Sequence, residues 1–393
     1  MLEHYSVENF KSFKKRTEFD FMVDETYSTL RESNTADGIL KGGLFVGGNA
    51  SGKTNAVQAI KFLLDALFYN EAINWKRFFC LFSASYNLDL NYRFRIDGHT
   101  IFYRLCYQKR KSSLKEELWL DKKVLLKRDG PNAESELSER KNFDNIPKQT
   151  VFLRDIWFNT GFRNHEVLQK WFSFLQNSVF YNSLTRGGWL YNDEIPGDID
   201  EYLSVNGVQG EQFLNRFLDE CGFPYRLRYN RAEAEKIARN YRNSRYAGLY
   251  LLRDEIKLKQ GIPVGYESMG NQVLLSILLP YLYVVGHGGM LIIDEFSSGL
   301  HNDLERLLIQ YFMRRSGNAQ IFLVSHSTNL LSSGLFRPDQ LYAVNFDENG
   351  SNVVRFSERE PRVSQNLEKM YLSGMFSGVP HYRDASEWGR DDV

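Results

Sequence analysis

The sequence predicts an α/β fold whose core is divided into two parts by a mostly helical insertion. Short apolar runs typical of buried strands alternate with stretches of helical periodicity at both ends of the 393-residue chain. Between them, residues 150–260 have apolar positions at helical spacing and no sustained heptad pattern. We therefore assign residues 1–105 and 261–393 to the core and residues 106–260 to the inserted lobe.

The composition is that of a folded protein with balanced charge. The 49 Lys and Arg residues equal the 49 Asp and Glu residues in number, which excludes a globally basic nucleic-acid coat protein and an acidic disordered tail. Aromatic residues make up 15% of the chain, as expected for a protein with a large buried core. The three cysteines form no CxxC pair, so neither a disulfide framework nor a zinc site is indicated.

The N-terminal segment and the longest apolar window both argue against a membrane protein. The first residues include Glu3 and are not followed by the apolar core of a signal peptide. The window 273–285 is interrupted by Ser276 and Pro280, and it is shorter than the roughly 20 residues that cross a bilayer. We expect a cytoplasmic protein that has no membrane partner.

The N-terminal part is expected to contain strands before and after one long helix. Residues 4–23 alternate loosely between apolar and polar side chains and predict two strands. Residues 43–46 predict a short buried strand, and the apolar residues within 57–67 then recur at helical spacing. A hairpin over residues 88–107, turning at Asp97-Gly98, is predicted next.

The C-terminal part repeats the alternation of helix and strand. Residues 269–285 predict an apolar helix, and residues 290–293 predict a buried strand. A second helix over 304–312 and a second buried strand over 321–324 follow. Residues 341–356 predict a hairpin. This order is typical of an α/β domain in which buried strands lie between helices.

Residues 47–54 have the sequence GGNASGKT, a full match to the phosphate-loop pattern GxxxxGK[S/T]. Glycines let backbone N–H groups turn inward around phosphates, Lys53 places positive charge on the β- and γ-phosphates, and the Thr54 hydroxyl binds Mg²⁺. The strand before the loop and the helix after it have the required order. The residues that we expect to hold the nucleotide are Gly47, Asn49, Ala50, Ser51, Gly52, Lys53, Thr54 and Asn55.

Two acids end the predicted strand 290–293. Packing gives no reason for a buried apolar strand to end in Asp294 and Glu295, since carboxylates at a strand tip need a cation or a water to act on. We expect Asp294 to hold Mg²⁺ through water and Glu295 to activate the attacking water as a general base. Alone, the pattern is also that of an ordinary strand exit, but a phosphate loop in the same chain favours the catalytic interpretation.

Ser268 and Gly270 stand at the start of the predicted helix 269–285. Small residues at a helix N-terminus can form a cradle for an anion. An ordinary helix cap, with Ser268 at the N-cap position, is the simpler alternative. The position of this cap shortly before the acid-tipped strand favours the anion cradle.

His326 follows the predicted strand 321–324. A single histidine is more often structural, but one at the end of a buried strand that follows an acid-tipped strand is well placed to contact a γ-phosphate. We therefore group His326 with Glu295 and Lys53 as catalytic residues. The turn 297–301 between the acids and the next helix is either a plain connection or a loop that couples two sites, and its sequence favours neither.

Taken together, these motifs resemble an ABC-type ATPase head. The phosphate loop, serine–glycine cap, Asp-Glu strand, small turn and strand-end histidine occur in the order of that family, with the cap in the place of the ABC signature. The details are most similar to the stand-alone ABC ATPases of bacterial phage-defence and abortive-infection systems, which are related to the RecF, SMC and OLD heads. The strings that carry this similarity are DEFSSGLH at 294–301, SHST at 325–328, LFRPDQLY at 335–342 and YLSGMFSGVP at 371–380.

The resemblance covers roughly residues 1–70 and 261–380 and departs from the family at two points. Asn271 follows the signature glycine, where family members often have Thr. The glutamine of the usual Q-loop has no counterpart that the sequence identifies.

The resemblance implies that ATP and Mg²⁺ are bound and that ATP lies between two copies of the chain. Ser268 and Gly270 of one copy would then contact the γ-phosphate held by the other. This implies a homodimer or higher homo-oligomer formed through the ATPase heads. It also implies a sensor or scaffold that controls a separate effector, a nuclease or toxin encoded beside it. The chain after His326 is too short for a Toprim nuclease of the OLD type, so we expect none.

Two other functions remain open. A RecF- or SMC-like DNA-repair ATPase would bind duplex DNA through the basic stripe 225–246, in which arginines such as Arg239 and Arg242 alternate with tyrosines. The same stripe could be a solvated surface or a protein contact, so nucleic acid is a possible partner only. A non-enzymatic assembly module gated by ATP binding is the third alternative.

Overall fold

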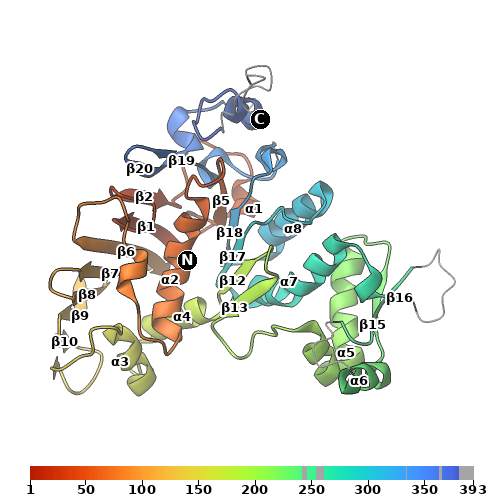
Figure 1. Ribbon diagram of the computed structural model, residues 1–393, viewed down its shortest axis with the longest axis horizontal. Helices are drawn as coiled ribbons and strands as arrows, with labels where there is room; N and C mark the ends of the chain where they lie inside the picture. The colour runs from red at the N-terminus through yellow and green to blue at the C-terminus, as the bar shows by residue number, and fades with distance from the viewer. Residues whose placement is uncertain (241–245, 254–260, 333, 363–364, 380–393) are drawn as a thin grey trace, which may run out of the picture. The chain divides into compact units, whose positions relative to one another are not determined.

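The computed structural model describes residues 1–393 except 241–245, 254–260, 333, 363–364 and 380–393 (Figure 1). The chain divides into two compact units. Unit 1 comprises Met1–Trp171 and Phe322–Val393, and unit 2 comprises Phe172–Ile321. Both units combine strands with helices, so the predicted α/β fold is confirmed.

Unit 1 contains an antiparallel sheet with the strand order β11-β10-β9-β8-β7-β6-β1-β2. Its strands are β1 (Leu2–Glu8), β2 (Thr17–Asp20), β6 (Asn87–Ile96), β7 (His99–Gln108), β8 (Ser113–Leu120), β9 (Lys123–Asp129), β10 (Asn132–Ser135) and β11 (Asn142–Phe143). Asp97 and Gly98 join β6 to β7 with φ of 51° and 81°, as a type I′ hairpin turn requires. The predicted hairpin and the two N-terminal strands are therefore confirmed.

Unit 1 also holds the strand that leads into the first long helix. Its other elements are α1 (Arg31–Asn34), β3 (Thr35–Ala36), β4 (Ile39–Leu40), β5 (Gly42–Val46), α2 (Lys53–Phe68), α3 (Phe152–Thr160), β19 (Leu341–Asp347), β20 (Gly350–Arg355) and α9 (Leu367–Leu372). β19 pairs in parallel with β5 and antiparallel with β20. The hydroxyls of Tyr5 on β1 and Tyr92 on β6 donate to carbonyls of α2 at 3.1 and 2.7 Å, which fixes the helix against the antiparallel sheet.

A buried ion pair joins the outer strands of this sheet to α3. Glu116 on β8 and Arg128 on β9 have fully buried side chains with 3.6 Å between Oε2 and Nη1. The Glu116 carboxylate also accepts hydrogen bonds from the backbone N–H groups of Phe152 and Leu153 at 2.7 and 2.8 Å. Because each buried carboxylate oxygen has a donor, the helix start is anchored to the sheet without an unpaired charge.

The observed units differ from the predicted lobe 106–260 in its first part. Residues 113–143 form β8 to β11 and extend the unit 1 sheet, because buried side chains such as Leu114, Glu116 and Leu118 alternate with more exposed neighbours. Glu116 breaks the apolar pattern by which such a strand is recognised. The helices predicted within 150–260 are present as α3 to α6.

In unit 2, three strands are neighbours in the order β13-β12-β17, at one end of a seven-stranded sheet, and β12 is parallel to β17. Helix α7 packs on β12 and β17, and α8 packs on α7. The elements are β12 (Val179–Asn182), β13 (Gly187–Leu190), α5 (Ile199–Glu220), β14 (Arg226–Tyr229), α6 (Arg231–Asn240), β15 (Leu249–Leu252), β16 (Ile262–Pro263), α7 (Met269–His287), β17 (Met290–Asp294) and α8 (Asn302–Arg315). The chain passes between the units within α4 (Glu166–Gln176) and β18 (Gln320–Val324).

Helix α7 is longer than the apolar window that the sequence suggested. Among the described residues it is the one helix long and apolar enough to cross a bilayer, with a mean hydropathy of 1.4 over its most apolar window. However, 56% of that window is buried inside the protein, and the Tyr281 hydroxyl donates to the Leu308 carbonyl of α8 at 2.7 Å. A core helix passes the same test of length and composition, so α7 is weak evidence for a membrane span.

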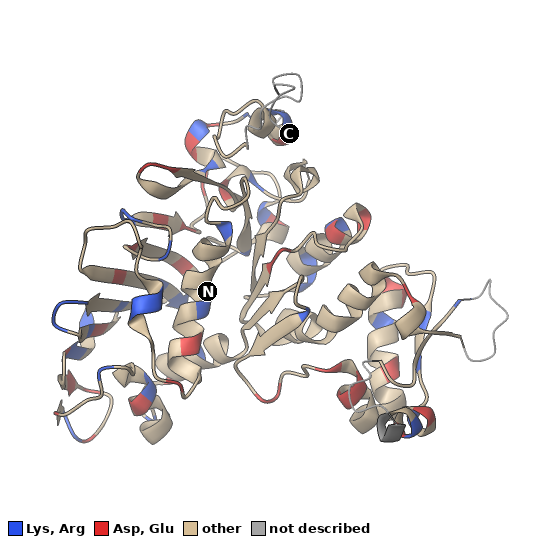
Figure 2. Ribbon diagram, in the orientation of Figure 1, with Lys and Arg blue, Asp and Glu red and all other residues tan. Residues whose placement is uncertain are grey.

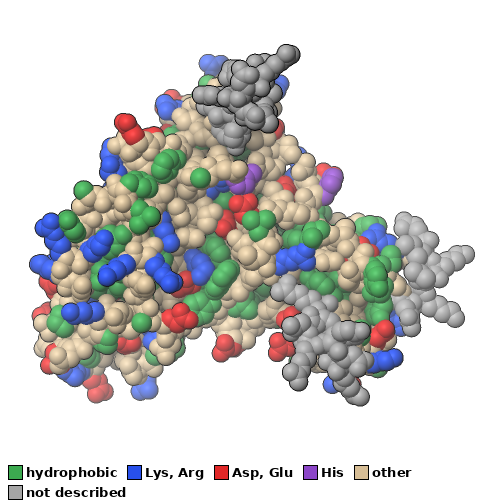
Figure 3. All heavy atoms as spheres, in the orientation of Figure 1, with side chains coloured by type: hydrophobic (Ala, Val, Ile, Leu, Met, Phe, Trp, Pro, Cys, Tyr) green, Lys and Arg blue, Asp and Glu red, His purple; other side chains and the backbone are tan. Residues whose placement is uncertain are grey.

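Charged side chains of both signs are distributed over both units. Figure 2 shows Lys and Arg interspersed with Asp and Glu along α8 and along the strands of the unit 1 sheet. The space-filling view shows the same mixture, together with hydrophobic side chains, on its visible face (Figure 3). The zero net charge of the chain therefore arises from mixing, not from one basic and one acidic unit.

Candidate functional site

The phosphate loop of residues 47–54 joins β5 to α2 in unit 1, as predicted. Gly47 and Gly52 have positive φ of 156° and 106°. A Cβ on Gly47 would lie 2.3 Å from the carbonyl oxygen of Val344, and one on Gly52 would lie 2.2 Å from the hydroxyl oxygen of Ser351. Both positions therefore admit only glycine, and the backbone takes the tight curve that directs N–H groups toward an anion.

Lys53 and Ser51 indicate that the loop is shaped for phosphates. The buried Lys53 ammonium curls over the loop and donates to the carbonyl oxygens of Gly47 and Gly48 at 3.0 and 2.7 Å. The hydroxyl oxygen of Ser51 is buried and has no hydrogen-bond partner within the described part of the chain. Thr54 follows in the first turn of α2. A triphosphate would supply acceptors to both side chains, so these residues fit a nucleotide.

Two serines that the sequence did not identify hold the phosphate loop from outside. The Asn55 amide donates to the Ser12 hydroxyl at 2.7 Å, although we predicted Asn55 as a nucleotide contact. The Ser351 hydroxyl lies 2.6 Å from the Ser51 carbonyl oxygen and 2.7 Å from the Ser12 hydroxyl. Ser12 and Ser351 are 339 positions apart in sequence, so no local pattern links them to the loop.

His326 lies in unit 1 with the phosphate loop. Ser325 is buried at the end of β18, and its N–H donates to the Phe45 carbonyl oxygen at 3.1 Å. Since Phe45 lies two residues before Gly47, the chain leaves β18 beside the strand that feeds the phosphate loop. His326 follows immediately and is exposed.

Asp294 ends β17 in unit 2 and is 4% exposed. Its Oδ2 accepts a hydrogen bond from the side-chain amide of Asn182 at 3.2 Å, and its carbonyl oxygen accepts one from the N–H of Ser183 at 3.1 Å. Asn182 is the last residue of β12, directly opposite Asp294 in the parallel register. The Asn182 amide therefore orients the Asp294 carboxylate from the neighbouring strand, and Asn182 carries no motif by which the sequence could have identified it.

Glu295 has a backbone conformation that is unusual for its residue type. Its φ is 58°, in the left-handed region that residues other than glycine rarely adopt. The N–H of Ser298 donates to its carbonyl oxygen at 3.0 Å, which closes a tight turn directly after the strand. Such conformations persist where surrounding structure fixes them and are common at active sites.

The predicted signature forms the start of α7. Ser268 is the N-cap residue, with the N–H of Asn271 3.4 Å from its hydroxyl oxygen. A Cβ on Gly270 would lie 2.8 Å from the carbonyl oxygen of Gly299, so this glycine allows the turn after the acids to approach the helix. The side chain of Met269 is 56% exposed, so this helix start is accessible to another molecule.

The turn 297–301 connects the two motifs of unit 2. Gly299 contacts the signature, and the Ser297 hydroxyl is hydrogen-bonded to the side chain of Glu305 on α8. Burial raises the pKa of the Glu305 carboxyl, and one of its oxygens has no partner within the described residues. These contacts connect the turn to the start of α7 and to α8, and both interpretations of the turn remain predictions.

Asn271 has a structural role at the position where related ATPases often have Thr. Its side-chain oxygen accepts a hydrogen bond from the Tyr225 hydroxyl at 3.1 Å, and its amide donates to the Glu267 carboxylate at 2.9 Å. The Arg253 guanidinium pairs with the same carboxylate at 3.2 Å. The departure from the family pattern thus anchors the signature to the β14–β15 sheet.

Each unit contributes part of the predicted site. Unit 1 brings together the phosphate loop and His326, and unit 2 brings together the signature, the two acids and the turn. The described residues hold no group of three His, Cys, Asp or Glu side chains that could bind a metal by themselves.

The basic stripe 225–246 is only partly described. Arg226 pairs with Asp219 and Arg231 pairs with Glu235, at 3.1 and 3.2 Å. These ion pairs fit the solvated-surface interpretation. Arg242 lies outside the described residues.

Comparisons with known proteins define the fold. The chain is similar to the structure titled "Crystal structure of the SmcHead bound to the C-winged helix domain of ScpA", with 14% identity, 90% of this chain and 96% of that chain covered, and a TM-score of 0.50. The chain has the fold of an SMC-type ATPase head. The chain is also similar to the SMC head domain from Thermotoga maritima, with 15% identity, 90% of this chain and 98% of that chain covered, and a TM-score of 0.48. A third similar structure is a Smc head domain with an extended coiled coil bound to the C-terminal domain of ScpA derived from Pyrococcus furiosus. It has 12% identity, 90% of this chain and 95% of that chain covered, and a TM-score of 0.45.

Residues 191–332 of this SMC-type head match a family model described as "AAA domain, putative AbiEii toxin, Type IV TA system". The matched segment contains the signature, both acids and His326, but not the phosphate loop. No curated protein sequence matches the chain significantly. The predicted ABC-type head is thus confirmed as a fold.

Proposed function

We propose that the chain binds ATP and hydrolyses it to ADP and phosphate. The observation that carries this proposal is the phosphate loop on an ABC-type head. Two positions in the loop admit only glycine, Lys53 curls over its carbonyl oxygens, and the buried Ser51 hydroxyl has no acceptor among the described residues. A triphosphate is the ligand class that this cradle fits best.

For hydrolysis we propose the following roles of the predicted residues. Glu295 takes a proton from the attacking water as the water oxygen bonds to the γ-phosphorus and the bond to the bridging oxygen breaks, so that ADP leaves. Lys53 and His326 stabilise the negative charge on the γ-phosphate. Thr54 and Asp294 would hold Mg²⁺, which when bound neutralises charge on the β- and γ-phosphates. Asn182 keeps the Asp294 carboxylate oriented through its 3.2 Å hydrogen bond.

We further propose that two copies act together. Ser268 is exposed at the start of α7, and Met269 beside it is 56% exposed, so the signature is accessible to a nucleotide bound by a second copy. ATP would then favour a homodimer because it contacts residues of both copies only in that state. Hydrolysis would remove those contacts and release the dimer.

The biological role that we propose is sensor or scaffold subunit of an anti-phage abortive-infection system, which controls a separate nuclease or toxin. The match of residues 191–332 to a model named for the AbiEii toxin supports this context. Two of the similar SMC heads are titled as complexes with a domain of ScpA, and we propose a protein partner here too. All three cysteines are free, and two of them are buried, in keeping with a cytoplasmic location.

The proposal is tested by replacing the phosphate-loop lysine. Lys53→Ala should weaken ATP binding, measured by calorimetry, by about a hundredfold and abolish phosphate release, because the ammonium is the main counter-charge of the phosphates. Lys61→Ala is the matched control, since Lys61 lies on the same helix and pairs with Asp65 at 2.6 Å. Equal ATP binding by the two variants would contradict the proposal.

A further inference from the structure

A series of hydrogen bonds within unit 2 begins at the acid that we assign to the metal. The Asp294 carboxylate accepts from the Asn182 amide at 3.2 Å. The oxygen of the same Asn182 side chain accepts from the N–H of Thr185 at 3.0 Å. One side chain therefore holds the carboxylate and also closes the turn between β12 and β13.

Arg186 follows this turn and reaches α7. Its φ of 50° is in the left-handed region, which a bulky residue adopts only where other contacts hold it. Its Nη1 donates to the side-chain oxygen of Gln272 at 3.0 Å, and its Nη2 contacts the sulfur of Met269. The planar guanidinium thus binds two residues on the first two turns of the helix that carries the signature.

Gln272 links Arg186 to the segment that precedes the signature by a further hydrogen bond. Its amide nitrogen donates to the carbonyl oxygen of Glu267 at 3.1 Å, directly before Ser268. The Tyr246 hydroxyl donates to the Gln272 carbonyl oxygen at 2.8 Å and holds the same turn of α7 from another side. The two ends of the Gln272 side chain therefore connect Arg186 to the backbone that presents the signature.

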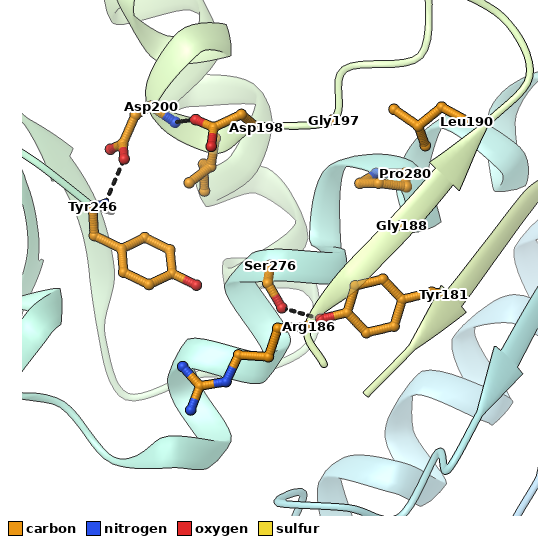
Figure 4. Close-up of a pocket in the computed structure, with 11 residues that line it drawn as sticks. Tyr181, Arg186, Gly188, Leu190, Gly197, Asp198, Asp200, Tyr246, Ser276 and Pro280 are labelled. Carbon is orange, nitrogen blue, oxygen red and sulfur yellow. Dashed lines mark hydrogen bonds between the residues drawn. The ribbon is translucent and has the colours of Figure 1, made fainter. Parts of the chain in front are cut away.

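A second contact joins the same hairpin to α7. The hydroxyls of Tyr181 and Ser276 lie 2.5 Å apart. Figure 4 shows this pair beside Arg186, on one wall of a cavity of about 140 Å³ that also has Asp200 and Tyr246 in its lining. The hairpin therefore contacts α7 through two pairs of side chains, Arg186 with Gln272 and Tyr181 with Ser276.

We propose that Arg186 is a positioning residue that transmits the state of Asp294 to the signature of the same copy. A change in the hydrogen bond between Asp294 and Asn182 alters the turn at Thr185, and Arg186 passes this change to Gln272. The signature would be positioned for the nucleotide of a second copy only when Mg²⁺ and nucleotide are bound at Asp294 of its own copy. This inference rests on the proposed function and adds a residue to which no role has been assigned.

The experiment must distinguish the proposed positioning role of Arg186 from a purely structural role. Arg186 could stabilise unit 2 by packing against α7 without linking the two motifs. Substitution would then lower the melting temperature and leave turnover per folded molecule unchanged. The test therefore combines kinetics with measurements that need no turnover.

The experiment uses the full chain with Arg186→Ala, Gln272→Ala and the double variant, and with Arg314→Ala, an exposed arginine on α8, as control. We expect ATP affinity in EDTA to stay within about twofold, because the phosphate loop is untouched, and kcat with Mg²⁺ to fall about tenfold in each single variant. The double variant should fall no further, since both changes interrupt one series of contacts. Without nucleotide, amide hydrogens of residues 264–268 should exchange faster in Arg186→Ala than in wild type or Arg314→Ala.

Three results would overturn the inference: unchanged kcat in Arg186→Ala, additive losses in the double variant, or unchanged exchange at residues 264–268. If Arg186→Ala does not fold, Arg186→Lys decides, because a lysine reaches only one of the two partners and should give an intermediate kcat. Absence of wild-type hydrolysis contradicts the proposed function itself. Wild-type hydrolysis with normal turnover in Arg186→Ala contradicts only the role of Arg186.

Discussion

The phosphate loop of unit 1 and the signature segment of unit 2 are both expected to bind the same γ-phosphate, but they are stabilised in different ways. The loop is fixed by backbone geometry, because a Cβ at Gly47 or Gly52 would clash with β19 or β20 residues at 2.3 or 2.2 Å. The signature segment is fixed by side chains, since Gln272 and Asn271 hold the backbone and carboxylate of Glu267.

This difference has a functional consequence. A loop fixed by its own backbone is ready for a nucleotide at all times, whereas a segment held by long polar side chains can shift when a partner changes. We therefore expect the phosphate loop to set nucleotide affinity and the signature to set turnover. Substitutions in the two regions should separate these two effects.

Gly52→Ala should abolish nucleotide binding. The added Cβ lies 2.2 Å from the Ser351 hydroxyl oxygen, and φ of 106° is strained for alanine, so the loop must distort. We expect calorimetry to show a loss of ATP affinity of at least about a hundredfold. Gly38→Ala is the matched control in unit 1, with φ of 74° and no atom within 4 Å of the added Cβ. If both variants bind ATP equally, backbone geometry does not set affinity.

Gly270→Ala should separate turnover from affinity. Its Cβ would lie 2.8 Å from the Gly299 carbonyl oxygen and would push the turn away from the signature. We expect kcat to fall about tenfold and ATP affinity to change by less than about twofold, because the phosphate loop is untouched. Gly286→Ala on the same helix meets nothing within 4 Å and should keep wild-type kinetics. A parallel loss of affinity and kcat in Gly270→Ala would show that the two regions do not divide these roles.

Ser12→Ala and Ser351→Ala should each weaken ATP binding by about three- to fivefold. Their hydroxyls form one small network with Asn55 and the Ser51 carbonyl oxygen, with distances of 2.6–2.7 Å, so each loss loosens the loop from outside. The double variant should be little worse than either single variant, since both belong to the same network. Additive effects in calorimetry would show that the serines act separately.

The partly buried Asp200 carboxyl, which lines a cavity together with residues of α7, should make the free energy of unfolding depend on pH. Burial, together with the nearby Asp198 carboxylate, raises the pKa of Asp200 to about 7 from 3.8. Between these two values the folded state binds more protons than the unfolded state, so this group lowers the free energy of unfolding as the pH rises toward about 7. Asp200→Asn should remove this part of the dependence, on the order of 1 kcal/mol after allowance for partial exposure. Identical stability profiles from pH 4 to 8 would show that Asp200 is not perturbed.

The sequence predicted those parts of the site that depend on backbone conformation or on the order of neighbouring residues in the chain. The phosphate loop needs glycines at fixed positions between a strand and a helix, and Asp294 and Glu295 stand directly at the end of an apolar strand. The Asp97-Gly98 turn is similar, because its two positive φ angles restrict the residue types.

The residues that the sequence did not reveal act through contacts between distant segments. Ser12 and Ser351 touch the loop from opposite ends of the chain, and Asn182 and Arg186 become significant only beside Asp294 and Gln272. A serine, asparagine or arginine in these positions resembles any surface polar residue in the sequence alone. The segment that forms β8 to β11 was assigned to the inserted lobe for a related reason, since a buried charged residue such as Glu116 breaks the apolar pattern of its strand.

We propose that ATP binds between two copies of the chain and that hydrolysis separates them. Light scattering coupled to size-exclusion chromatography of Glu295→Gln, with ATP and Mg²⁺, tests this dimerisation. We expect a stable dimer in this variant, because ATP still binds but the general base is lost, whereas Glu295→Gln combined with Lys53→Ala should stay monomeric. A Glu295→Gln protein that binds ATP and remains monomeric would contradict the account.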